Sequence, residues 1–121
     1  MESVPAVALV TVQVIFGLIL GFNYLNGVRN KPTLIGIHFL LGAVALEVMA
    51  LMLRGAPSGW VADGKPTLTL AAALMAAALL TGLAGAMFGK PMPKTARVAL
   101  YSHAGIAVAA YGALVLWAFS T

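Results

Sequence analysis

The stretch from Lys31 to Leu53, KPTLIGIHFLLGAVALEVMALML, decides the fold class of this chain. From Thr33 onward it is apolar except for two ionisable side chains, His38 and Glu47. A helix of this length, at about 1.5 Å per residue, crosses a hydrocarbon layer of about 30 Å. We therefore expect a transmembrane helix here. Ionisable groups inside such a helix are costly, so both side chains are candidate functional residues.

The composition of the whole chain is that of an integral membrane protein. Its 121 residues are 62% hydrophobic and 8% charged, with a mean hydropathy of +1.02. Four apolar spans, at about 4–24, 33–53, 66–88 and 95–119, predict an all-α fold, a four-helix up-down bundle forming a single domain over 1–121. The absence of cysteine excludes disulfides, iron–sulfur clusters and covalently attached haem.

The basic residues lie between the spans, which indicates membrane topology rather than nucleic-acid binding. Five are in or beside the first and third connections, and two flank the second. The positive-inside rule then places the first and third connections in the cytoplasm and both termini outside, in an inner (cytoplasmic) membrane of bacterial type. The five are Arg29, Lys31, Lys90, Lys94 and Arg97, and the two are Arg54 and Lys65.

An offset of 65 residues aligns the two halves of the chain. It places His38 on His103 and Gly17 on Gly82. The halves therefore look like tandem copies of one helical hairpin, related by a pseudo-two-fold axis along the membrane normal. The second and fourth helices would then be parallel and diagonal across the bundle, with the two histidines at similar depth.

The histidine pair predicts a metal between the diagonal helices, whose axes would lie on the order of 11–14 Å apart. Two imidazoles alone are too few for zinc, whereas haem iron needs only axial ligands. We therefore expect one non-covalent haem b, with His38 and His103 as ligands of its iron. The same two histidines have two other interpretations: plain hydrogen-bonding groups, or members of a proton, metal-ion or small-solute pathway.

Small and basic residues around the histidines suit a haem. Gly42 and Ala107 follow the histidines by one turn and would leave room for the edge of the macrocycle, while small residues of the first and third helices would flank it. Basic side chains at the cytoplasmic face would pair with its propionates. The flanking small residues are Gly17, Gly21, Gly82 and Ala86, and the basic ones are Arg29, Lys31, Lys94 and Arg97.

With these features the chain resembles small membrane b-type cytochromes and the haem-bearing anchor subunits of respiratory dehydrogenases. The resemblance covers the four-helix pattern and the histidine pair. It implies axial ligation by His38 and His103, and electron transfer to or from a quinone or a partner subunit. It favours an electron-transfer subunit of a larger membrane complex over a stand-alone enzyme. The alternatives are a haem-free scaffold or assembly subunit and a small proton-coupled transporter.

Three other polar residues lie within apolar spans and are expected to contact polar partners. Glu47 lies about 2.5 turns from His38, on the opposite side of the helix, where it is expected to contact another subunit, a second copy of the chain or a quinone. Tyr111 is a candidate donor to Glu47, with an aromatic packing role as the alternative. Gln13, near the middle of the first span, is expected to make an interhelical hydrogen bond.

Overall fold

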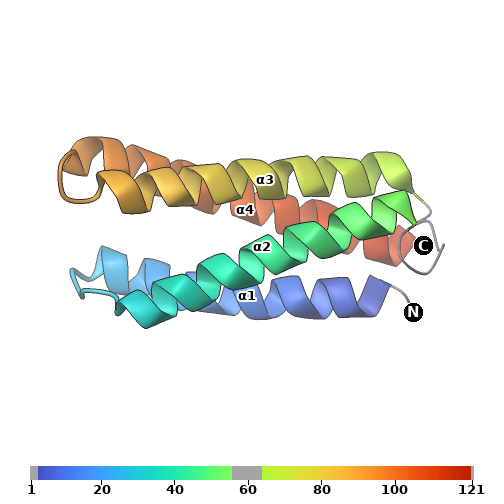
Figure 1. Ribbon diagram of the computed structural model, residues 1–121, viewed down its shortest axis with the longest axis horizontal. Coiled ribbons are helices and arrows are strands. Elements are labelled where there is room, and N and C mark those ends of the chain that lie inside the picture. Colours follow the sequence, from blue (N-terminus) through green and yellow to red (C-terminus); the bar gives the residue numbers. More distant parts are fainter. Residues whose placement is uncertain (1–2, 56–63, 121) are drawn as a thin grey trace.

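Four long α-helices make up the part of the chain that the structure describes (Figure 1). This is a computed structural model, and it describes residues 3–55 and 64–120. The helices are α1 (Ser3–Leu25), α2 (Pro32–Arg54), α3 (Lys65–Phe88) and α4 (Pro93–Ser120), and these two ranges hold no strand. Each helix contains the range expected from the sequence. Each is also long and apolar enough to cross a membrane, as in a multi-pass membrane protein.

Local sequence explains where α2 begins and ends. Pro32 is its first residue, a position where the missing N–H costs nothing. Gly55 ends it with a positive φ of 79°, which glycine adopts without strain. The connection before α2 is held by asparagine side chains: Asn23 Nδ2 donates to Asn30 Oδ1 at 2.9 Å, and Asn30 Nδ2 donates to the Leu20 carbonyl at 3.0 Å.

The helices form two antiparallel hairpins, α1–α2 and α3–α4, that lie side by side (Figure 1). Helix α1 packs against α2 and α4, and α3 packs against the same two helices. The pairs α1/α3 and α2/α4 make no close backbone contact, so they are the diagonals. The histidine-bearing helices α2 and α4 thus face each other across the centre.

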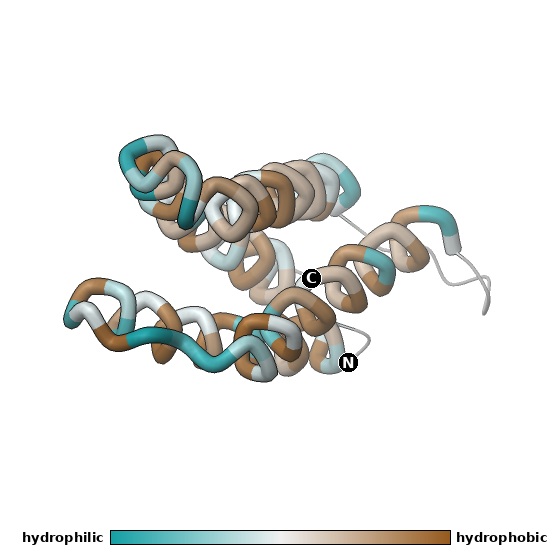
Figure 2. The backbone as a smooth tube through the Cα atoms, turned by 60° about the vertical axis from the view of Figure 1, so that its left-hand side comes forward, coloured by the Kyte–Doolittle hydropathy of each residue, from teal (hydrophilic) through white to brown (hydrophobic). Residues whose placement is uncertain are grey.

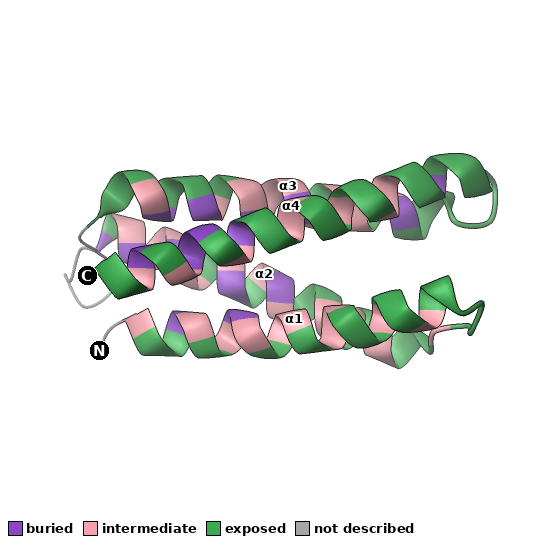
Figure 3. Cartoon of the chain, turned by 180° about the vertical axis from the view of Figure 1, so that it is seen from behind, coloured by how far each residue is buried: buried purple, intermediate pink, exposed green. Residues whose placement is uncertain are grey.

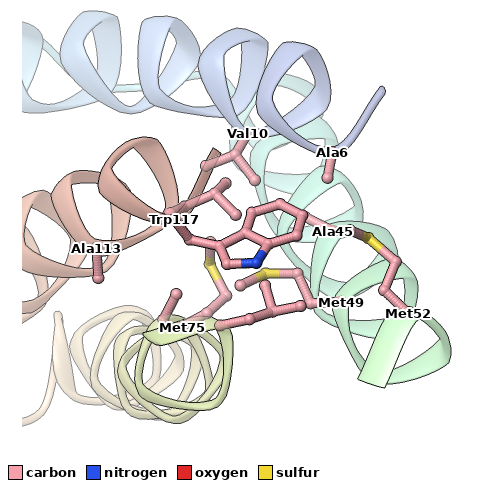
Figure 4. Packing of buried hydrophobic residues seen from close by; sticks show 11 residues of the cluster. Ala6, Val10, Ala45, Met49, Met52, Met75, Ala113 and Trp117 are labelled. Carbon is pink, nitrogen blue, oxygen red and sulfur yellow. The ribbon is translucent and has the colours of Figure 1, made fainter. Parts of the chain in front are cut away.

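A buried apolar cluster joins all four helices toward the end that carries both termini (Figure 4). Trp117 lies at its centre, 1% exposed, with Met49 and Met75 beside it. The small side chains in the cluster let the helix backbones approach closely. Its other members are Ala6, Val10, Ala45, Met52, Leu68, Ala71, Ala113 and Leu114.

Toward the opposite end the two hairpins diverge (Figures 1 and 3). No residue of α1 after Val10 is buried, and none of α2 before Gly42. The buried residues of this end are Gly85 and Ala96, which pack against each other's helix within the α3–α4 hairpin. Tight packing between the hairpins therefore stops near the middle of the molecule.

The outer surface of the helices is apolar, as lipid contact requires. Hydrophobic residues run along the helices, and hydrophilic ones gather mostly at their ends (Figure 2). Large apolar side chains such as Leu18, Phe22 and Val108 are exposed. A surface of this kind is stable against hydrocarbon and would be a liability in water.

Two leucines of α4 test the buried cluster with matched chemistry. Leu114 is fully buried and Leu116 is 70% exposed. Because lipid is as apolar as the protein interior, truncation in the membrane costs mainly the lost packing. We expect Leu114→Ala to lower the free energy of unfolding by about 2 kcal/mol and Leu116→Ala to change it little. Unfolding of detergent-purified protein measures both, and equal losses would contradict the packing described.

Candidate functional site

His38 of α2 and His103 of α4 meet between the two hairpins, nearer the helix ends that carry the α1–α2 and α3–α4 connections than the opposite ends. Their ring centroids are 6.0 Å apart, and the ring planes are nearly perpendicular, at 86°. Both side chains are partly buried. The helices that carry them are diagonal neighbours, so the two side chains bridge a distance that the backbones do not. The structure thus brings together the two residues that the sequence predicted as a pair.

Each imidazole is held by a backbone carbonyl of the preceding helix. His38 Nδ1 lies 3.1 Å from the carbonyl oxygen of Gln13, and His103 Nδ1 lies 2.6 Å from that of Ala78. A carbonyl oxygen only accepts, so Nδ1 carries the proton and donates. In a neutral imidazole this leaves a lone pair on Nε2. Neither Nε2 has a hydrogen-bond partner among the described residues.

Glycines make these two hydrogen bonds geometrically accessible. In an α-helix each side chain leans toward the N-terminus, so the residue at i+4 partly covers the carbonyl of residue i. Gly17 and Gly82 stand four residues after Gln13 and Ala78. A Cβ at Gly17 would lie 3.0 Å from His38 Cε1, and one at Gly82 would lie 2.9 Å from His103 Nδ1. The missing side chains leave space for the rings.

The same arrangement therefore occurs twice, at the offset of 65 residues found in the sequence. In each hairpin a carbonyl accepts from a histidine 25 residues later, and a glycine at i+4 lies against the ring. The two imidazoles enter the centre from opposite hairpins. We call these two histidines with Gly17, Gly82 and the two accepting carbonyls the histidine site.

The histidine site offers two nitrogen ligands. In residues 3–55 and 64–120 no group of three or more His, Cys, Asp or Glu side chains could hold a metal ion. Structural zinc takes four protein ligands, so two are too few, whereas haem iron needs only axial ligands from the protein. The two rings lie 6.0 Å apart between centroids, in a T-shaped arrangement. By its number and type of donors, the histidine pair suits a haem better than a zinc ion.

The small residues predicted to surround a macrocycle make other contacts. Gly17 and Gly82, expected to flank a macrocycle, instead lie against the imidazoles. Gly42 is buried against the Gln13 side chain, so it leaves no open space one turn from His38. Ala107, its counterpart, is partly buried. Nothing lies within 4 Å of a Cβ built on Gly21, and Ala86 is exposed.

The four basic residues predicted near propionates are all exposed. They lie in or beside the connections at the end where the hairpins diverge (Figure 1). This is the side of the histidine site away from the buried cluster. The residues are Arg29, Lys31, Lys94 and Arg97.

The other predicted polar residues lie outside the histidine site. Glu47 is exposed on α2, with neither a hydrogen bond nor an ion pair among the described residues. Tyr111 does not accompany it: the Tyr111 hydroxyl lies 2.8 Å from Thr11 Oγ1, which ties α4 to α1. For Gln13 the interhelical hydrogen bond goes to the backbone carbonyl rather than to the side chain. Sequence reasoning missed this because carbonyls carry no residue-type signal.

Comparison with known proteins found no family model, no curated protein and no solved structure that matches this chain. A function for this protein is therefore inferred from the geometry of the histidine site.

Glycine substitutions test the seating of the imidazoles. Gly17→Ala and Gly82→Ala each place a Cβ at about 3 Å from a histidine ring. The ring must move, so we expect a loss of stability in the range of overpacked cores, about 1–3 kcal/mol. Gly21→Ala on the same face of α1 meets open space and is the matched control. Thermal unfolding in detergent measures all three. A Gly17→Ala protein as stable as Gly21→Ala would show that the ring does not lie there.

Proposed function

We propose that this protein is a membrane b-type cytochrome-like electron-transfer subunit that holds one haem b between α2 and α4. The observation that carries the proposal is the pair of imidazoles from opposite hairpins, each anchored through Nδ1 and each with no Nε2 hydrogen bond to the described residues. An Nδ1–H donated to a carbonyl is the usual outer-sphere arrangement of a metal-binding histidine. Haem supplies one-electron transfer when it is bound.

The protein's own residues would position the cofactor. His38 and His103 would hold its iron, and the carbonyls of Gln13 and Ala78 would fix the tautomer and orientation of both rings. No residue of α1 after Val10 or of α2 before Gly42 is buried, so a large group on that side of the histidines would displace little tight packing between the hairpins. The basic residues at that end would attract carboxylate groups such as propionates.

The membrane context completes the proposal. The basic connections, between α1 and α2 and between α3 and α4, would face the cytoplasm of a bacterial-type inner membrane, with both termini outside. The repeated carbonyl–glycine–histidine arrangement supports an integral four-helix up-down bundle built from two tandem hairpins. Electron exchange would be with another subunit of a membrane redox complex or with a quinone.

Glu47 would serve assembly rather than the histidine site. Its carboxyl is exposed on an apolar span and has no partner among the described residues. A carboxyl facing lipid is costly, which favours contact with another subunit or a second copy of the chain.

The ligand assignment predicts a spectroscopic result. Detergent-purified protein should show the low-spin spectrum of a b-type haem, oxidised and after dithionite reduction. His38→Ala and His103→Ala should each abolish that spectrum or convert it to high spin, because each removes one axial ligand. Ser102→Ala, an exposed neighbour of His103, is the control and should keep the wild-type spectrum.

Two outcomes would contradict this prediction. A colourless wild-type protein from haem-replete cells would remove the cofactor from the proposal. Wild-type spectra in both single histidine variants would show that other residues hold the haem.

The proposed orientation predicts the behaviour of reporter fusions. A reporter that works only in the periplasm should be active when fused after Thr121, and one that works only in the cytoplasm should be active when inserted near Met92. The physical reason is the excess of basic residues around the first and third connections. Activity in the reverse pattern would place the basic connections, between α1 and α2 and between α3 and α4, outside the cell.

A further inference from the structure

The Gln13 side chain is a polar group near the histidine site that does not bond to either imidazole ring. Its backbone carbonyl holds His38, but its carboxamide lies against α2 at Gly42. A Cβ on Gly42 would lie 2.5 Å from Gln13 Nε2, so a side chain at position 42 would displace the amide. Gly42 therefore forms the seat of this carboxamide. The seat is one turn from His38 along α2, about 5.4 Å of helix rise.

The carboxamide is incompletely satisfied. Gln13 Oε1 is buried, and it has no hydrogen-bond partner among the described residues. A buried acceptor without a donor costs about 1–3 kcal/mol. In a low-dielectric interior the partial negative charge on this oxygen is also uncompensated, so it favours positive charge nearby. Such a group acts on the electrostatics of its surroundings without touching the ligands.

The second hairpin carries no such group. At the offset of 65 residues Gln13 corresponds to Ala78, and Gly42 corresponds to Ala107. Both hairpins keep the histidine, the accepting carbonyl and the glycine at i+4, but only the first adds a carboxamide and a glycine that makes room for it. The two halves of the histidine site therefore share the imidazole–carbonyl bond and differ in the polar groups around it. The first half has the Gln13 carboxamide. The second has the Thr81 hydroxyl, which lies 3.1 Å from the Ala78 carbonyl oxygen and 2.9 Å from that of Ala77.

We propose that Gln13, seated on Gly42, makes the two histidines electrostatically inequivalent and shifts the reduction potential of the haem between them. This inference rests on the proposed function. The reason is that the oxidised iron carries more positive charge than the reduced iron, so an incompletely compensated amide dipole in the same low-dielectric interior acts unequally on the two states. Gln13 is a tuning residue, separate from the axial ligands.

Redox titration of the haem-loaded full chain in detergent tests the proposal. Gln13→Met keeps an unbranched side chain of similar length and removes the amide, so it should shift the midpoint potential while keeping the bis-histidine spectrum. Thr11→Val removes another polar group of α1, one that bonds to Tyr111 rather than lying at Gly42, and should leave the potential unchanged. A wild-type potential in Gln13→Met would overturn the proposal.

The seat is tested by a double-mutant cycle in the same measurement. Gly42→Ala should displace the carboxamide and so shift the potential of the otherwise wild-type protein. The same substitution should produce no further shift in the potential of a Gln13→Ala variant, which has no carboxamide to displace. Equal shifts in both backgrounds would show that Gly42 does not act through Gln13, which would overturn the inference. A wild-type protein that binds no haem would overturn the proposed function itself and this inference with it, so the two failures are distinguishable.

Discussion

Each histidine ring is tied through Nδ1 to a backbone carbonyl of the preceding helix, and the rest of the site depends on this hydrogen bond. Helix carbonyls already accept one bond from the helix itself, and their second lone pair is normally shielded by the side chain at i+4. Gly17 and Gly82 remove that shield. The bond then sets the tautomer, the direction of the ring and the rotation of each helix against its neighbour. One carbonyl, one glycine and one histidine thus form a unit that the chain uses twice.

The histidine site lies at the boundary between two packing regimes. On one side Trp117, Met49 and their neighbours join all four helices into a buried cluster. On the other side the hairpins diverge, and burial is confined to the α3–α4 pair. The buried cluster fixes how the four helices pack on that side of the histidines. On the other side, the residues of α1 and α2 are not buried.

The imidazole–carbonyl–glycine arrangement occurs in both hairpins, and the polar groups around it differ between them. Equivalent positions of the two hairpins lie at similar depth, and their two imidazoles meet between the hairpins. The Gln13–Gly42 pair differs from its counterpart, Ala78 and Ala107, at both positions. The longer Gln13 side chain lies against Gly42, which has no Cβ to displace it. Groups around metal ligands commonly adjust the potential of a bound metal, which is the role proposed for Gln13.

The sequence by itself determined the four apolar helices, their approximate ends and the pairing of His38 with His103. These follow from local hydropathy, from the Pro and Gly residues at helix ends and from the offset of 65 residues, all of which are properties of short segments or of the order of residues along the chain. The tertiary structure alone decided which neighbours these residues contact. Helical periodicity places a glycine on a face, but helix rotation and depth decide whether that face meets an imidazole, a carboxamide or lipid. For this reason Gly17 and Gly82 contact the histidine rings, Gly42 contacts Gln13, and Tyr111 bonds to Thr11 instead of to Glu47.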